Sequence, residues 1–146
     1  MTPAPPGPVV DDKEDLFRGI TTVAWWVEEE GRPSSAAFKH PDFSVDVVSL
    51  AGSHIHTLGH LPPGSGVVQF NCGAARLIGF TTRLEPDPEQ PGNHAHANVY
   101  NPEKPSQRKK MAQRLASTCC TTVHAPDLVM LANNAAADDT DAAANA

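Results

Sequence analysis

A chain of 146 residues with 40% hydrophobic content, only 5% aromatic residues and 14 prolines has room for one domain with a small packed core. Its net charge of −6 argues against a protein that coats nucleic acid over its whole surface, although a local basic patch is compatible with that charge. The three cysteines form no Cys-x-x-Cys pair, which favours a reducing compartment over a disulfide framework. We find no signal-peptide pattern and no apolar run of the roughly 20 residues that a membrane span requires, and therefore expect a cytoplasmic protein with no membrane partner.

Both ends of the chain differ in composition from its middle. Residues 1–14 combine prolines with acidic side chains and predict a flexible leader. Residues 123–146 are rich in alanine and aspartate, and after Leu131 they offer no apolar face, which predicts a disordered tail. We expect a single globular domain over residues 15–122.

The pattern of apolar and turn residues predicts mostly short strands. The expected strands cover residues 16–20, 23–27, 43–48, 66–70, 80–84 and 96–100. A helical turn over 74–78 is closed by Gly79, and a longer helix is expected over 105–119, whereas 54–60 reads as a loop. Strands joined by short loops and followed by one substantial helix indicate an α+β fold with a small, mostly antiparallel sheet, one long C-terminal helix and short helical turns.

Five of the seven histidines fall in two clusters, which makes a metal site one candidate. They are His54, His56, His60, His94 and His96. On a strand, a His-x-His pair points both imidazoles to one face and could hold a metal ion. The first cluster lies in an expected loop, however, and no carboxylate lies nearby in sequence. We therefore predict no metal site, and keep a metal-dependent hydrolase as an alternative.

Positive charge gathers in the first turns of the long helix. Five of the eleven basic residues lie between positions 104 and 114: Lys104, Arg108, Lys109, Lys110 and Arg114. A helix N-terminus carries positive partial charge, so cations there are tolerated best with an anion bound between them. At about 100° per residue Arg108 falls at the N-terminal end of the apolar face and could point toward a site. The alternative is an ordinary solvated charge run.

A polar turn, Arg32-Pro33-Ser34-Ser35, precedes an apolar pair. Its local role would be a cap, with Ser34 or Ser35 closing the turn formed by residues 36–38. Its functional role would be to offer a guanidinium and hydroxyls to an anionic group. Cys119 falls on the apolar face of the long helix, where we expect it to be packed.

Several of these stretches together resemble a family of small, uncharacterised bacterial proteins. They are Leu16-Phe17-Arg18, Arg32-Pro33-Ser34-Ser35 with Ala37-Phe38, Ser44-Val45-Asp46, Ala75-Arg76 with Gly79, and His96-Ala97 ahead of the basic helix. The resemblance spans most of residues 16–118 and implies a domain boundary and candidate positions, but no reaction. In its pattern the position of His94 is more often proline, and 54–60 is a variable segment. It singles out Arg18, Arg32, Ser34, Ser35, Asp46, His96 and Lys104.

The leading hypothesis is a binding module for an anionic ligand, such as a nucleotide or a nucleic-acid phosphate, at the start of the basic helix. The side chains expected to converge on this ligand are Arg32, Ser34, Ser35, His96, Lys104 and Arg108, with Arg18 and Lys109 as further ligand-binding candidates. Such binding would weaken steeply with salt. No cofactor is predicted.

Two alternatives remain beside the metal-dependent hydrolase. A phosphate- or NAD-handling enzyme would use His96 as general acid or base with Asp46 orienting it, and Arg32 with Ser34 would hold a phosphate-bearing substrate. Its NAD-handling form resembles one ADP-ribosyltransferase pattern in the early Arg18 strand and the later serine pair, but lacks a late glutamate on a strand. An accessory protein would instead dock a partner chain through Trp25 and Trp26, of which we expect one to be buried and the other partly exposed.

Overall fold

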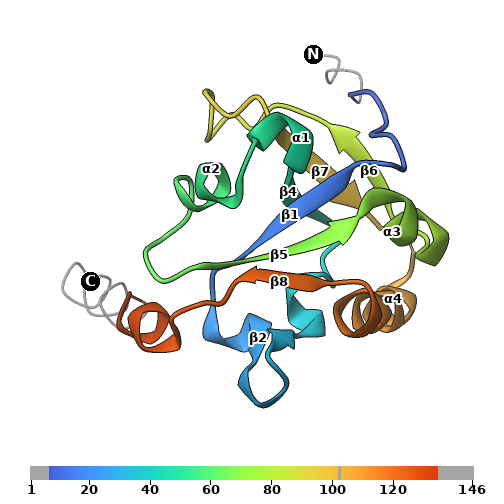
Figure 1. The fold of residues 1–146 in the computed structure, drawn as a ribbon. Coiled ribbons are helices and arrows are strands. Elements are labelled where there is room, and N and C mark those ends of the chain that lie inside the picture. Colours follow the sequence, from blue (N-terminus) through green and yellow to red (C-terminus); the bar gives the residue numbers. More distant parts are fainter. Residues whose placement is uncertain (1–6, 102, 135–146) are drawn as a thin grey trace, which may run out of the picture.

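The computed structural model describes residues 7–101 and 103–134 and has the predicted α+β fold, built on one antiparallel sheet (Figure 1). The strand order is β6-β7-β4-β1-β5-β8. The strands are β1 (Asp15–Ile20), β4 (Asp42–Val47), β5 (Gly66–Asn71), β6 (Thr81–Leu84), β7 (His96–Tyr100) and β8 (Thr121–His124). The α-helices are α1 (Val48–Ala51), α2 (His54–Leu58), α3 (Cys72–Ile78) and α4 (Pro105–Thr118).

A small hairpin stands apart from this sheet. It pairs β2 (Trp26–Val27) with β3 (Arg32–Pro33). Three short 3₁₀ helices surround it: η1 (Val23–Trp25), η2 (Glu28–Glu30) and η3 (Ser35–Ala37). The last of them, η3, packs on α4 and so joins the hairpin region to the core.

One face of the sheet carries the hydrophobic core. Aromatic rings interlock there, with Phe38 at 5.5 Å from Phe43 and 5.9 Å from Phe70, measured between ring centroids. Helix α4 closes this face with its buried residues Ala112, Leu115 and Ala116. Pro105 begins α4, a position where the missing N–H of proline has no intrahelical partner to lose.

The opposite face of the sheet is covered by α1 and α2. Because side chains alternate along a strand, Asp46 points away from Val45 and Val47, which belong to the core. On this second face Thr57 of α2 donates a hydrogen bond to Asp46. Figure 1 shows α2 and α4 on opposite sides of the sheet.

The sheet opens between its two central strands. β1 pairs with β5 over all six of its residues, but with β4 only at Leu16↔Val47 and Phe17↔Asp46. β4 meanwhile continues to pair with β7 as far as Asp42↔Tyr100. Residues 18–20 and 42–45 therefore separate, and a gap opens in the middle of the sheet.

Most predicted elements are present, and the exceptions have local causes. The strand expected over 23–27 is the 3₁₀ helix η1 followed by a two-residue strand, and the loop expected over 54–60 begins with α2. The sequence analysis missed α1 and β8. The residues of β8 are mostly exposed, so this edge strand lacks the apolar alternation that identifies a half-buried strand.

The packed region extends past the predicted limits of 15–122 on both sides. In the expected leader, Val10 is buried and Val9 forms a bridge with Arg83 on the edge strand β6. In the expected tail, residues 128–134 are helical and Leu131 is buried. The remaining parts of both predictions, 1–6 and 135–146, lie outside the described residues. No helix among the described residues has the length and apolar character needed to cross a membrane.

Burial of the same residue type on two helices gives a test of this packing. Leu115 on α4 is fully buried, whereas Leu77 on α3 is 81% exposed. We expect Leu115→Ala to lower the free energy of unfolding by about 2–5 kcal/mol, because it removes buried methyl groups and leaves a cavity. Leu77→Ala should change it by less than about 0.5 kcal/mol. Urea unfolding followed by circular dichroism measures both, and equal effects would contradict the described core.

Candidate functional site

A cavity of about 90 Å³ lies at the gap between β1 and β4. Because the gap passes through the sheet, residues from both faces line it. The polar lining residues are Arg18, Ser44, Asp46, Thr57, His60, Gln90 and His96, and Trp25 and Leu61 are among the apolar ones. Three of the predicted site residues, Arg18, Asp46 and His96, thus share one cavity.

Arg18 occupies a position on the core side of β1, between Leu16 and Ile20. It is 8% exposed. Its Nε and Nη2 donate to the Ala37 carbonyl oxygen at 3.1 and 3.0 Å, and its Nη1 donates to the Ser44 carbonyl oxygen at 3.1 Å. The guanidinium carbon lies 4.6 Å from the ring centroid of Trp25, a distance at which the ring face attracts a cation.

No carboxylate within the described residues lies within 4.0 Å of the Arg18 guanidinium. Burial lowers the pKa of Arg18 to about 10, so the group is still a cation at neutral pH. A guanidinium has five N–H groups, and the three hydrogen bonds to carbonyl oxygens leave two without a protein acceptor. Arg18 is therefore a buried cation with donor capacity to spare.

His96 begins β7 on the other face of the sheet and is 4% exposed. Its Nδ1 lies 2.6 Å from the Glu85 carbonyl oxygen. A carbonyl oxygen only accepts, so Nδ1 carries the proton and Nε2 of the neutral ring holds a lone pair. Nε2 is buried and has no hydrogen-bond partner within the described residues; a carboxylate oxygen of Asp87 lies 3.7 Å away.

Asp46 does not orient His96, contrary to the sequence-based hypothesis. The two residues are opposite each other on β4 and β7. The Asp46 carboxylate is nevertheless occupied by other donors, the Thr57 hydroxyl at 2.7 Å and the Asn93 amide at 2.8 Å. Asp46 thus fastens α2 and the 85–95 segment to the sheet, and the carbonyl of Glu85 orients His96.

Asn93 ties together the residues around this face of the cavity. Its amide nitrogen donates to Gln90 as well as to Asp46, and its oxygen accepts from the Ala95 backbone and from His56 Nε2. Sequence reasoning missed Asn93, Gln90 and Thr57, because nothing in a proline-rich loop or an expected loop marks them as neighbours of Asp46.

The segment that carries Glu85 is fixed by a second polar group. The Glu85 carboxylate accepts from the Tyr100 hydroxyl at 2.6 Å and from the Asn98 amide at 3.0 Å. Burial opposes ionisation of Glu85, but these two hydrogen bonds, together with a backbone hydrogen bond from Gly7 and the positive charge of Arg83, outweigh burial, and the pKa of Glu85 is lowered. Glu85 therefore stays a carboxylate while its own carbonyl positions His96.

The polar turn at 32–35 lies at a different cavity, of about 380 Å³. Arg32, Ser34 and Ser35 line it together with Gln113 and Ser117 of α4. The Arg32 guanidinium pairs with Glu30 at 2.6 Å. The predicted cap is wrong in detail: Ser34 holds the N-cap position of η3, but its hydroxyl donates to the Ala24 carbonyl oxygen instead.

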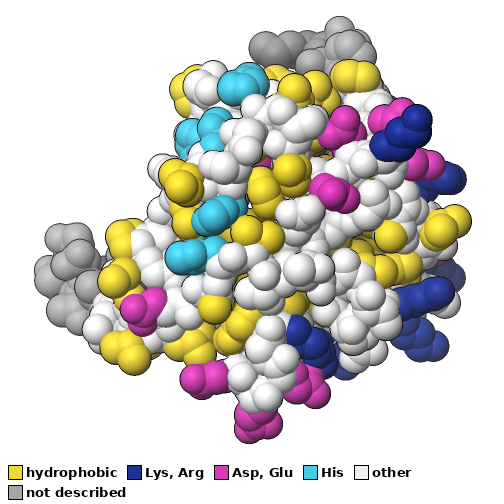
Figure 2. Space-filling view, viewed as in Figure 1, with side chains coloured by type: hydrophobic (Ala, Val, Ile, Leu, Met, Phe, Trp, Pro, Cys, Tyr) yellow, Lys and Arg dark blue, Asp and Glu magenta, His cyan; other side chains and the backbone are white. Residues whose placement is uncertain are grey.

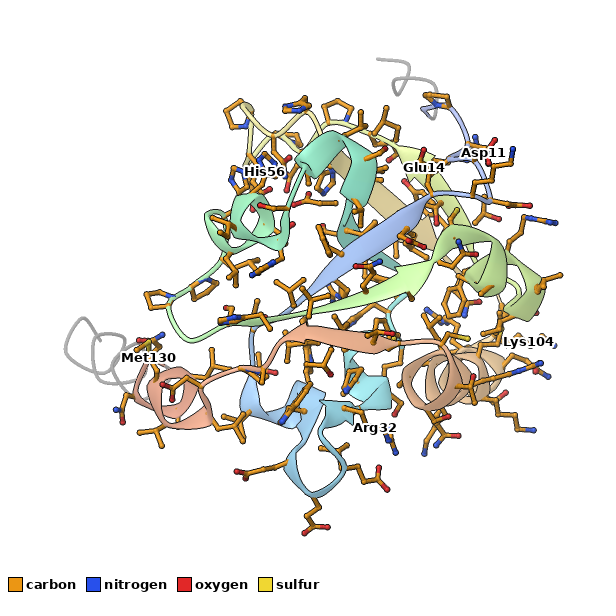
Figure 3. The ribbon with its side chains drawn as sticks, in the orientation of Figure 1. Asp11, Glu14, Arg32, His56, Lys104 and Met130 are labelled. Atoms are coloured by element: carbon orange, nitrogen blue, oxygen red, sulfur yellow. The ribbon has the colours of Figure 1, made fainter. Side chains whose placement is uncertain are left out.

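The remaining predicted residues, on α4, line neither of these two cavities. Lys104 and Lys109 are exposed, whereas Arg108 is half-buried, with a buried Nε that has no hydrogen-bond partner in the described residues. Figure 3 shows His56, Arg32 and Lys104 at three separate places on the molecule. The predicted convergence of residues 32–35, His96 and α4 on one ligand is therefore absent.

Five other histidines, His54, His56, His60, His94 and His124, gather around α2, and Figure 2 shows histidine side chains on the side of the molecule opposite α4. The ring centroid of His56 lies 5.0 Å from that of His60 and 5.7 Å from that of His94. His56 is bonded to Asn93, and His94 to the Leu50 carbonyl oxygen. Among the described residues, no group of three or more His, Cys, Asp or Glu side chains is placed to hold a metal ion.

The tryptophans differ from the expectation of one buried and one partly exposed ring in that neither is fully buried. Both are half-buried, and Trp25 packs against the Arg18 guanidinium at the cavity. Cys119 is half-buried against the core, as expected for a packed thiol.

Searches against family models, curated proteins and solved structures found nothing that matches this chain. The resemblance to a family of small bacterial proteins stays a prediction. The candidate site therefore rests on its own geometry.

The ionisation of Tyr100 tests its hydrogen bond to Glu85, the residue whose carbonyl oxygen orients His96. Tyr100 is the only tyrosine in the chain, so the phenolate absorbance reports on this one side chain. Burial, together with the hydrogen bond to the Glu85 carboxylate, raises the pKa of Tyr100 to about 12, against about 10 for a free phenol. We expect the ultraviolet absorbance of the phenolate to rise near pH 12 in the folded protein and near pH 10 in urea.

A phenol pKa that is higher in the folded chain stabilises the fold below pH 10, and this contribution disappears as the pH rises from about 10 to about 12. Glu85→Gln should shift the folded midpoint back toward 10, because the negative charge is gone. Circular dichroism at each pH verifies that the chain is still folded. A midpoint near 10 in the folded native sequence would refute the contact between Tyr100 and Glu85.

Proposed function

We propose that this chain binds a small molecule through an anionic group in the cavity between β1 and β4, and that His96 acts there as a general base. The observation that carries the proposal is the pair of buried groups that line one cavity. Within the part of the chain that the structure describes, the Arg18 guanidinium has no carboxylate partner and Nε2 of His96 has no hydrogen-bond partner. This is the phosphate-handling enzyme of the sequence analysis, with Arg18 in place of Arg32 and Ser34.

The charge of Arg18 supports an anionic ligand. Removing a cation from water costs several kcal/mol unless a counter-charge and hydrogen bonds compensate it. Carbonyl oxygens and the Trp25 ring supply part of this compensation. A carboxylate or phosphoryl oxygen of a ligand would accept from the two N–H groups that have no protein acceptor and supply the missing charge.

Backbone groups at the gap support the same ligand class. Hydrogen-bonding groups alternate sides along a strand. Glu14 O accepts from Cys72 N on the β5 side, so Gly19, an odd number of residues away, turns its N–H toward β4. Val47 N donates to Ala95 O on the β7 side. Ser44 is three residues away, so by the same alternation its backbone N–H and carbonyl point toward β1. Neither Gly19 nor Ser44 has a partner in the short β1–β4 ladder, and both line the cavity.

His96 supports a chemical role in addition to binding. With its proton fixed on Nδ1 by the Glu85 carbonyl oxygen, the lone pair of Nε2 can accept the proton of a water molecule as the water oxygen attacks the bound substrate and the leaving group departs. The imidazolium that forms would lie 3.7 Å from the Asp87 carboxylate, which stabilises the positive charge. This carboxylate takes the place of the predicted Asp46 partner.

The size of the cavity limits the ligand. A volume of about 90 Å³ equals that of about three water molecules, whereas pockets for whole drug-sized ligands are about 300–1,000 Å³. The cavity fits one phosphoryl or carboxylate group, with the rest of the substrate outside. This favours a small phosphate- or carboxylate-bearing substrate over the NAD-handling alternative.

The other sequence-based functions stay predictions. Anion binding at the start of α4 lacks a cavity that gathers Arg32, Ser34, Ser35 and His96. Docking of a partner chain through Trp25 and Trp26 is less favoured, because Trp25 packs on Arg18. The three cysteines are free thiols, which supports the proposed cytoplasmic location.

Titration with inorganic phosphate and with acetate, followed by the backbone amide resonances of the ¹⁵N-labelled protein, tests the proposal. We expect saturable shifts at Gly19 and Ser44. His96→Asn keeps a donor for the Glu85 carbonyl oxygen but lacks the Nε2 lone pair, which can accept from the P–OH group of phosphate, and should weaken phosphate binding about tenfold, the loss expected for one hydrogen bond to a charged partner. Acetate has no proton to donate to Nε2, so its binding should be unchanged. His124→Asn makes the same change on the exposed edge strand β8 and should bind normally.

Hydrolysis of p-nitrophenyl phosphate and p-nitrophenyl acetate tests the chemical role. His96→Asn should lower the rate by about 10²–10⁴-fold, the range for loss of a positioned base. Saturable binding with no turnover that depends on His96 would reduce the proposal to a binding protein. The absence of saturable shifts with both anions would reject it.

A further inference from the structure

The outward face of α4 carries the densest positive charge of the molecule. Lys109, Lys110 and Arg114 are exposed on it, the exposed Lys104 directly precedes α4, and Arg108 is half-buried near its start; α4 contains no acidic residue. Within residues 7–101 and 103–134, none of these five cations has a carboxylate within 4.0 Å. Figure 2 shows Lys and Arg side chains gathered on the side where α4 lies.

This charge is not needed to keep the chain in solution. The other six basic residues stand against 17 acidic ones, all of which lie outside α4. Like charges at neighbouring helix positions repel one another and destabilise the helix. Such a concentration on an acidic protein is the electrostatic footprint of a surface that meets a polyanion.

The polar residues of the same face match a phosphate backbone. Ser106, Gln107 and Gln113 are exposed between and beside the cations, and their hydroxyl and amide groups can donate to phosphate oxygens. A helix of 14 residues is about 21 Å long, which equals the axial span of about six phosphates along one strand of B-form DNA. From these features we propose that the outward face of α4 binds the sugar–phosphate backbone of a nucleic acid without reading its sequence.

The face does not fit a membrane or a protein partner as well. The apolar residues Ala112, Leu115 and Ala116 of α4 are buried in the core, so α4 has no apolar side to insert between lipids. Protein interfaces usually have buried aromatic or aliphatic anchors, and the exposed residues of α4 include none. A contact that relies on charge and hydrogen bonds alone is typical of non-specific nucleic-acid binding.

The acidic hairpin limits where the nucleic acid lies. Glu28, Glu29 and Glu30 are exposed at its tip, and Arg32 beside them pairs with Glu30. Gln113 and Ser117 line the cavity that faces this hairpin. At about 100° per residue, Lys110 falls opposite the buried residues of α4 and next to Ser117, whereas Arg114 falls about 60–100° from Ser117 and Gln113, on the side away from the hairpin. The nucleic-acid backbone should therefore cross the face at Lys110 and continue toward Arg114.

Fluorescence anisotropy with a labelled 20-base-pair DNA duplex and a 20-nucleotide RNA, over about 25–200 mM salt, tests this surface. For about three phosphate contacts, the logarithm of the association constant should fall with the logarithm of salt concentration with a slope near −2.7 for the DNA duplex and near −2.1 for the single-stranded RNA. Lys110→Gln/Arg114→Gln should weaken binding at least tenfold at low salt and make the slope for the duplex about 1.8 less steep.

A control variant removes the same charge elsewhere. Lys13→Gln/Arg83→Gln lies near the N-terminal segment and β6, and should leave affinity within about twofold; the neighbours of Lys13, Asp11 and Glu14, lie away from Lys104 in Figure 3. Equal losses in the two variants, or binding without salt dependence, would overturn the proposal. Stronger binding to polyglutamate or to phosphatidylserine vesicles than to either nucleic acid would do the same.

Cavity binding and α4 binding are separable in this experiment. Lys110→Gln/Arg114→Gln should leave the shifts of Gly19 and Ser44 with phosphate unchanged, because these α4 residues do not line the cavity. His96→Asn should leave nucleic-acid affinity unchanged. Either proposal can therefore fail while the other holds.

Discussion

The early end of the β1–β4 ladder is the constraint on which the rest of the structure depends. A sheet that stops pairing in its interior leaves backbone groups that must find other partners. Arg18 provides one of them: its guanidinium donates to Ser44 O across the gap and to Ala37 O in η3. A side chain thus takes over from the ladder, and it brings a positive charge into the centre of the sheet. The cavity and its positive charge both follow because the Arg18 side chain takes the place of the missing β1–β4 hydrogen bonds.

The segment over 85–95 completes the cavity from the other face, and it is held by side chains instead of regular structure. Asn93 links it to Asp46 on β4 and to His56, while Glu85 is bonded to Tyr100 and Asn98 on β7. The same segment supplies the carbonyl that sets the tautomer of His96. The chemistry of His96 therefore depends on polar contacts between a loop and two strands, each of which a single substitution can remove.

Local patterns were sufficient to predict most strands and α4, because alternation and helical periodicity reflect the burial of each residue. Arg18 was singled out through the resemblance to a family of small bacterial proteins and not through a local pattern, although its position alternates with Leu16 and Ile20 on the core side of β1. Local patterns could not show that Arg32 and His96 lie at different cavities, because that follows from the strand order, in which β7 pairs with β4 across a long sequence separation. Asn93 and Gln90 carry no pattern of their own, and only the folded loop brings them to Asp46.

The hydrogen bonds of Arg18 also decide which variants can distinguish the two proposed surfaces. Ala37, which accepts two of these bonds, belongs to η3, and η3 packs on α4. A change at Arg18 therefore alters the cavity and, through η3, the support of the basic helix. His96 lies on the far face and contacts the 85–95 segment, so its replacement acts on the cavity alone. An effect on nucleic-acid binding from Arg18 but not from His96 would thus report the structural link through η3 and not a shared ligand.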